Sequence, residues 1–167
     1  IDDATGQTSY RYDEQSRLTA VILPNGMKVR TVYGEGEEDD RQIVYPDGSR
    51  VTYAYDVAGR IVSVADSMGA TTLGYNKAGE LIERVLPNGL TSRYGYDHAG
   101  RPVSAEHRLD GALVLAHEYQ LDGAGRPVVK KRITSADTSV MEYRYDPVGR
   151  LGEERLADGS SIQHEYD

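Results

Sequence analysis

Apolar and polar residues alternate along short stretches of the chain, and turn-forming residues separate these stretches. β-branched and aromatic side chains dominate Arg50–Tyr55 and Arg60–Val64, which is typical of strands. Tyr53 and Tyr55 are two residues apart and therefore share one face of a strand. No window longer than about 10 residues shows a helical period. The pattern predicts an all-β chain with little helix.

A nine-residue motif, Tyr-x-Tyr-Asp-x-x-Gly-Arg followed by an apolar residue or proline, recurs along the chain. Looser copies begin at Tyr10, where Ser16 replaces the glycine, and at Tyr75, where Asn76 and Glu80 replace Asp and Arg. Another begins at Tyr119 with Leu121 in the second tyrosine position, and the weakest copy is at Tyr33. The three close copies supply the repeat residues Tyr53, Tyr55, Asp56, Gly59, Arg60, Tyr94, Tyr96, Asp97, Gly100, Arg101, Tyr143, Tyr145, Asp146, Gly149 and Arg150.

The second tyrosine position gives the register of the repeat, at residues 12, 33, 55, 75, 96, 121, 145 and 166. A second turn signal follows the motif arginine by about nine residues, and two turns in about 22 residues leave room for two ordinary strands. The repeat is therefore predicted to be a β-hairpin. The second signals are Pro24-Asn25-Gly26, Pro46-Asp47-Gly48, Ser67-Met68-Gly69, Pro87-Asn88-Gly89, Leu109-Asp110-Gly111 and Ala157-Asp158-Gly159.

Each turn has its own chemistry. Asp-x-x-Gly suits a type I turn in which the aspartate accepts backbone N–H groups and glycine takes a positive φ. Pro-Asn-Gly and Pro-Asp-Gly suit a second tight turn. In Glu80–Leu86 apolar residues occupy both parities, which indicates either a bulge near the glycine turn or a sheet covered on both faces. The acidic stretch 34–40 is expected to be an exposed loop.

Composition narrows the function classes. The mean hydropathy of -0.58 and the 38% hydrophobic content leave no segment that resembles a membrane span, which needs roughly 20 apolar residues. The net charge of -8 disfavours nucleic acid and anionic membrane surfaces as partners. Without cysteine there is no disulfide and no thiolate metal site. No signal peptide follows Ile1, and because the chain ends within a copy of the motif we expect it to be a piece of a longer protein.

The motif and its period near 21 residues resemble the YD repeat of Rhs (rearrangement hotspot) proteins, which also occurs in wall-associated proteins, teneurins and the B/C shells of insecticidal toxin complexes. The resemblance covers essentially the whole chain. It implies hairpins side by side in one curved, spiralling antiparallel sheet, as part of a hollow shell that in bacterial members encloses a C-terminal toxin domain. It also implies a secreted or cell-surface bacterial protein.

Two elements of the toxin-bearing relatives are not found in this sequence. One is the core segment with an aspartyl autoprotease, and the other is the toxin domain itself. Asp146-Pro147-Val148-Gly149 has a similar string, but it lies in register within an ordinary repeat and is interpreted as a turn. No catalytic residue is therefore carried over from the family.

The polar residues of the motif could bind a metal ion, an anion or a sugar, or they could have only structural roles. The aspartates at 13, 56, 97, 122 and 146 lack the glycine-rich turns of calcium-binding repeats, so turn capping or pairing with arginine is favoured. The histidines at 98, 107, 117 and 164 lack metal-ligand spacing and are interpreted as surface or inter-strand residues. The arginines at 17, 60, 101, 126 and 150 could form an anion or glycan stripe, and the tyrosines a sugar platform, but pairing and packing within the sheet are favoured.

We therefore predict that residues 1–167 form a single array of about seven YD repeats, with about fourteen strands. The expected function is non-enzymatic: a structural segment of the encapsulating shell of a secreted bacterial Rhs-type toxin protein. Its partners would be the rest of its own shell and an enclosed C-terminal toxin domain, with no cofactor or metal. Open sheet edges favour self-association. The alternative is an extracellular carbohydrate-binding or cell-surface adhesion module.

Overall fold

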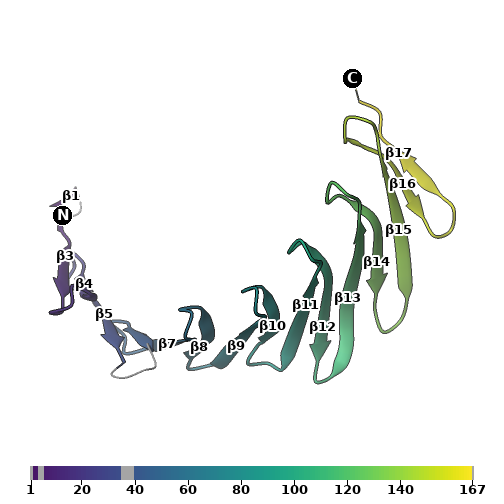
Figure 1. Ribbon diagram of the computed structural model, residues 1–167. Helices are drawn as coiled ribbons and strands as arrows, with labels where there is room; N and C mark the ends of the chain where they lie inside the picture. Colours follow the sequence, from purple (N-terminus) through teal and green to yellow (C-terminus); the bar gives the residue numbers. More distant parts are fainter. Residues whose placement is uncertain (1, 4–5, 35–39, 167) are drawn as a thin grey trace. The chain divides into compact units, whose positions relative to one another are not determined.

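The computed structural model describes residues 2–3, 6–34 and 40–166, and of residues 2 and 3 only the backbone. These residues form strands and turns, with no helix among them (Figure 1). The strands are β1 Asp2–Asp3, β2 Gly6–Gln7, β3 Ser9–Tyr12, β4 Leu18–Ile22, β5 Lys28–Tyr33, β6 Arg41–Val44, β7 Arg50–Tyr55, β8 Ile61–Asp66, β9 Gly69–Tyr75, β10 Leu81–Val85, β11 Leu90–Tyr96, β12 Pro102–Leu109, β13 Ala112–Leu121, β14 Pro127–Ile133, β15 Thr138–Tyr145, β16 Leu151–Leu156 and β17 Ser161–Gln163.

The chain divides into two compact units, residues 1–73 and 74–167, with β9 running from one into the other. Within each unit every strand pairs with its neighbours in sequence, in the order β3 to β9 and β9 to β17. All the pairings are antiparallel, and a separate two-stranded sheet joins β1 and β2. The prediction of an all-β chain of side-by-side hairpins is confirmed, and fifteen strands in sequential order come close to the expected fourteen.

A strand ends at each of the first seven second-tyrosine positions, whereas β17 ends at Gln163, three residues before the eighth position at Tyr166. Strands β3, β5, β7, β9, β11, β13 and β15 end at residues 12, 33, 55, 75, 96, 121 and 145. Apart from the connection after Tyr33, which lies mostly outside the described residues, each hairpin begins at one of these residues and turns through the motif that follows it. These strand ends confirm the predicted register. The sequence could predict it because an Asp-x-x-Gly turn is formed by local contacts and does not depend on distant ones.

A β-bulge recurs beside the second tyrosine position. The pairing shifts between Ala54 and Tyr55, so that Tyr55 lies opposite Ile61 and Val62 is the extra residue. The same shift occurs at residues 12, 96, 121 and 145. An extra residue shifts the alternation, so that side chains beyond the bulge point to the opposite face of the sheet. This explains why apolar residues occur at both odd and even positions after the glycine turn. Of the two explanations that the sequence leaves open for Glu80–Leu86, the bulge is the one seen in these five other repeats.

The two turns of a repeat share one backbone arrangement. In Asp56–Arg60 the N–H of Gly59 donates to the carbonyl of Asp56, whose own N–H donates to the carbonyl of Arg60. In Leu23–Met27 the corresponding bonds join Gly26 to Leu23 and Leu23 to Met27. Both are type I turns closed by a residue of positive φ, in glycine or, in the first copy, Ser16 with φ of 61°.

Three of the turns that the structure describes in full differ from this arrangement. Ser67-Met68 and Asp110-Gly111 are two-residue loops, between the pairs Asp66–Gly69 and Leu109–Ala112. The turn between β14 and β15 has no glycine and was not predicted. There the Thr134 hydroxyl accepts the N–H groups of Ala136 and Asp137 at 3.2 and 3.0 Å. Thr-Ser-Ala-Asp is rich in residues that favour turns, and a threonine whose hydroxyl can cap the turn is the sequence signal for it.

Burial is shallow throughout the described residues. Among these residues the buried apolar ones are Ala20, Val44 and Ala116, and the buried polar one is Ser92, which is fully buried. Most other strand residues are half-buried. Stability must therefore come largely from contacts between neighbouring hairpins rather than from a deep core. The expected loop at 34–40 lies mostly outside the described residues, except that the N–H of Gly34 donates to the carbonyl of Asp40 at 2.6 Å.

Candidate functional site: a repeated Asp, Arg and Tyr network

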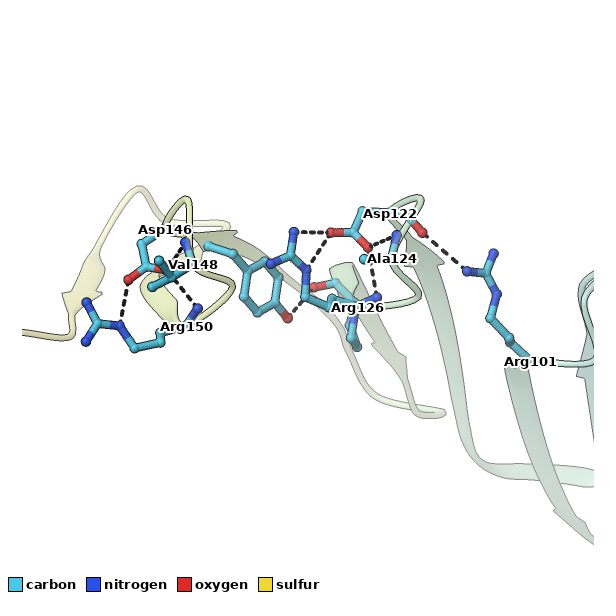
Figure 2. Close-up of polar contacts among 9 residues, drawn as sticks. Arg101, Asp122, Ala124, Arg126, Asp146, Val148 and Arg150 are labelled. Atoms are coloured by element: carbon cyan, nitrogen blue, oxygen red, sulfur yellow. Dashed lines mark hydrogen bonds and ion pairs between the residues drawn. The ribbon is translucent and has the colours of Figure 1, made fainter. Parts of the chain in front are cut away.

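The motif aspartate organises its own turn. One carboxylate oxygen of Asp56 accepts the N–H groups of Ala58 and Arg60 at 2.9 and 3.0 Å, and the other accepts Nε of Arg60 at 2.8 Å. The same three contacts form at Asp13, Asp97, Asp122 and Asp146, and Figure 2 shows the last two. The carboxylates are between 21% and 24% exposed. Their oxygens serve turn capping and arginine pairing.

These hydrogen bonds lower the pKa of each motif aspartate. For Asp56 and Asp146 the side chain of the following arginine lowers the pKa most. For Asp13, Asp97 and Asp122 the backbone N–H of that arginine has the largest effect. All five carboxylates are therefore ionised at neutral pH, as their pairing with arginine requires.

The arginine then connects one repeat to the next. The guanidinium of Arg126 lies over the ring of Tyr145, 4.5 Å from its centroid, while it remains paired with Asp122 at 2.7 Å. Arg17 lies over Tyr33 at 4.3 Å and Arg150 over Tyr166 at 4.7 Å in the same manner. A cation over an aromatic face is worth about 0.5–1 kcal/mol at exposed sites.

The tyrosine hydroxyl completes the connection. Tyr145 donates to the backbone carbonyl of Pro127, the residue that follows the arginine of the previous repeat, at 2.8 Å. The hydroxyls of Tyr33, Tyr96 and Tyr166 donate in the same way to the carbonyls of Leu18, Leu81 and Leu151 at 3.1, 2.9 and 2.9 Å. We call the combination of a guanidinium over the next repeat's tyrosine ring and this hydroxyl–carbonyl bond the interlock.

The motif glycine also contacts the previous repeat. A Cβ built on Gly149 would lie 3.1 Å from a terminal nitrogen of Arg126, and one on Gly125 would lie 3.2 Å from that of Arg101. Glycine is therefore required there both for a positive φ and for close approach. At Gly59 only the positive φ applies, because no atom lies within 4 Å of the added carbon.

Departures from the motif change the network in defined ways. Where Asn76 and Glu80 replace Asp and Arg, the Asn76 amide donates to the Glu80 carboxylate at 2.6 Å and its oxygen still caps the turn. After the weakest copy, Arg41 donates to the Tyr55 hydroxyl at 2.6 Å. That contact was not predicted, because Arg41 lies outside the motif.

The histidines take the inter-strand positions expected of them where contacts are seen. His107 Nδ1 lies 2.9 Å from the Ser92 hydroxyl on the paired strand, and His164 Nε2 lies 2.9 Å from Glu154. Within the described ranges no group of three or more His, Asp or Glu side chains is arranged to hold a metal ion. None of the described residues forms a long apolar helix that would cross a membrane.

Sequence comparison agrees with this geometry. The sequence profile of the RHS repeat family matches residues 1–27, 41–71 and 75–113, which is more than half of the chain. The chain belongs to the RHS repeat family. No curated protein matches it. In this RHS-repeat chain the residues that the profile spans include those that form the turn and ion pair at Asp56–Arg60 and the hydroxyl–carbonyl bond from Tyr96 to Leu81.

The RHS-repeat chain is also similar to several solved structures. It is 15% identical to a chain of the crystal structure of TcdB2-TccC3-Cdc42, over 97% of this chain and 12% of that chain, with a TM-score of 0.38. For the Photorhabdus luminescens Tc holotoxin pore the identity is 15%, over 94% and 11%, with a TM-score of 0.38. For TcdB2-TccC3 it is 14%, over 90% and 12%, with a TM-score of 0.37. The chain thus spans about an eighth of these proteins.

Proposed function

We propose that residues 1–167 act as one structural repeat array in the wall of a shell, and that the shell encloses a toxin domain of a secreted bacterial RHS-repeat protein. The observation that carries this proposal is the interlock, in which Arg126 and Tyr145 join consecutive hairpins. A side-chain network repeated from hairpin to hairpin favours an extended wall, because each unit stabilises its neighbour. The role is non-enzymatic, since the motif carboxylates and guanidiniums are paired with each other.

The partners in this proposal are the rest of the same shell and a C-terminal toxin domain. The wall would keep an active or partly unfolded polypeptide apart from its surroundings until delivery. Membership of the RHS repeat family supports this role, because the YD-repeat relatives that the motif resembles build such shells. A surface of net charge -8 also disfavours a role in binding nucleic acid.

The test uses the parent protein in its full length. Tyr145→Leu with Arg126→Gln removes one interlock, and Tyr45→Leu with Arg50→Gln changes the same residue types at exposed positions outside the motif, where the tyrosine is 39% exposed. We expect the first pair to expose the enclosed segment to protease and to raise its toxicity to the producing cell, and the second pair to leave both unchanged.

Equal protease sensitivity in the two double variants would contradict encapsulation by this wall. A glycan array provides the contrast with an adhesion module. A reproducible micromolar hit with the isolated chain, lost in the Tyr145→Leu variant, would replace the shell proposal with carbohydrate binding.

A further inference from the structure

A hollow lies in the second unit where the repeat departs from its motif. Its volume is about 550 Å³, within the range of about 300–1,000 Å³ that is usual for small-molecule sites. Leu121 occupies the second tyrosine position there and pairs with Pro127 through the same bulge as in the other repeats. The backbone is therefore that of an ordinary repeat, and the side chain differs. The hollow is lined by Arg101, Pro102, Tyr119, Leu121, Gly125 and Pro127.

In four other repeats a tyrosine occupies the corresponding place. Each donates its hydroxyl to the carbonyl of the residue after the Arg or Glu position of the previous repeat: Tyr33 to Leu18, Tyr96 to Leu81, Tyr145 to Pro127 and Tyr166 to Leu151. The equivalent carbonyl for Leu121 is that of Pro102, and leucine has no hydroxyl to donate. Pro102 is exposed, whereas those four carbonyl residues are half-buried. The hollow is therefore the place of a missing phenol ring.

The arginine of this repeat keeps its position without the ring. Arg101 pairs with Asp97 at 2.6 Å. It also donates to the carbonyl of Asp122 at 3.4 Å, as Figure 2 shows. A Cβ added at Gly125 would lie 3.2 Å from a terminal nitrogen of Arg101. The matching distance from Gly149 to Arg126 is 3.1 Å, so the two arginines take equivalent positions. A guanidinium that is already ordered loses little conformational freedom when a ring is placed under it.

We propose that this hollow binds the tyrosine side chain of another polypeptide. The ring would lie under the Arg101 guanidinium, and the hydroxyl would donate to the Pro102 carbonyl. A neutral phenol is favoured over an anion, because the charge of Arg101 is already paired with Asp97 and much of the lining is apolar. A peptide is favoured as the source because each occupant of this place in the other repeats is a side chain on an extended segment.

The inference does not rest on the shell proposal, and its test uses the chain alone. In an NMR titration with p-cresol, we expect saturable shifts of the Tyr119, Leu121 and Gly125 amides at millimolar concentration, and weaker binding of toluene. Leu121→Tyr fills the hollow and should abolish the shifts. Arg101→Gln should weaken p-cresol binding roughly two- to five-fold. Arg126→Gln is the control and should not weaken it, because Arg126 lies over a place that the Tyr145 ring already fills.

The reverse change gives a second measurement. Tyr145→Leu should create another saturable p-cresol site beside Arg126, and p-cresol should raise the melting temperature of that variant more than that of the unmodified chain. N-acetyl-tyrosinamide identifies the source of the ring, and should bind at Leu121 as p-cresol does. Binding of p-cresol without binding of this amide would overturn the assignment to a polypeptide. Shifts that do not saturate, or that persist in Leu121→Tyr, would overturn the site itself.

Discussion

At the scale of single residues, the motif is a set of local solutions to turn geometry. Aspartate supplies acceptors for two backbone N–H groups, and glycine supplies a φ that other residues adopt at a cost. Ser16 shows that the cost can be met, since it takes the same conformation with φ of 61°. The glycines differ, however, in whether a side chain of the previous repeat lies close to them.

Gly59 isolates the conformational effect. Gly59→Ala should lower the free energy of unfolding by about 1–2 kcal/mol, because φ of 75° is unfavourable for a residue with a Cβ. Ala58→Val, one residue earlier in the same turn and exposed, should change it by less than about 0.5 kcal/mol. Urea denaturation measures both variants, and equal midpoints would contradict the turn assignment.

Gly149 adds a steric effect to the same conformational cost. A methyl group there would lie 3.1 Å from a terminal nitrogen of Arg126, so the guanidinium over the Tyr145 ring would have to shift by a few tenths of an ångström. Gly149→Ala should therefore destabilise the chain more than Gly59→Ala. Combining it with Tyr145→Leu should remove the extra loss, since the displaced contact is then already absent.

At the scale of elements, adjacent hairpins are joined by side chains as well as by backbone pairing. The Tyr145 hydroxyl bond to Pro127 crosses from one repeat to the next, and burial raises the pKa of this phenol above its ordinary value. The five Asp–Arg pairs are partly exposed, and each such pair contributes little alone. Three of these arginines, Arg17, Arg126 and Arg150, also lie over the tyrosine ring of the next repeat.

Removing one hydroxyl measures this connection. Tyr145→Phe keeps the ring under Arg126 and removes only the bond to the Pro127 carbonyl, so unfolding should become easier by about 0.5–1.5 kcal/mol. Tyr12→Phe is the matched control, because Tyr12 is 62% exposed and occupies the same motif position in the first repeat. An equal effect of the two variants in chemical denaturation would show that the inter-repeat bond contributes nothing.

The aspartates make stability dependent on pH at the acid end. Their pKa values in the folded chain lie below the ordinary value of 3.8, so the stability that they contribute is present above that pH. It is lost as the pH falls through the lowered values. The melting temperature should therefore decline below about pH 4. Asp56→Asn, which introduces the residue type found at Asn76, should lower stability at neutral pH and flatten the decline, and an unchanged slope would contradict the pairing.

At the scale of the whole molecule, an open antiparallel sheet presents edges. Among the described residues β17 pairs only with β16, and β3 only with β4. Unpaired strand edges are templates for another strand. A single array over residues 1–167 remains a prediction, which a cooperative unfolding transition shared by probes in both units would support.

The edges predict self-association of the chain. Light scattering should show a mass that rises with protein concentration. Ile162→Lys places a charge on the edge strand β17, at a side chain that is 52% exposed, and should reduce this rise. A mass equal to that of the monomer at every concentration would contradict edge pairing.

The sequence by itself determined where strands end and chains turn, because Asp-x-x-Gly and Pro-Asn-Gly act within five residues. It did not reveal the turn at Thr134–Asp137, whose hydroxyl capping needs no glycine. It favoured pairing of the motif arginines with the motif aspartates over an anion stripe, and those five pairs are present. Only the tertiary structure placed Arg126 over Tyr145 and revealed the hollow beside Leu121, because both depend on packing between segments about 20 residues apart.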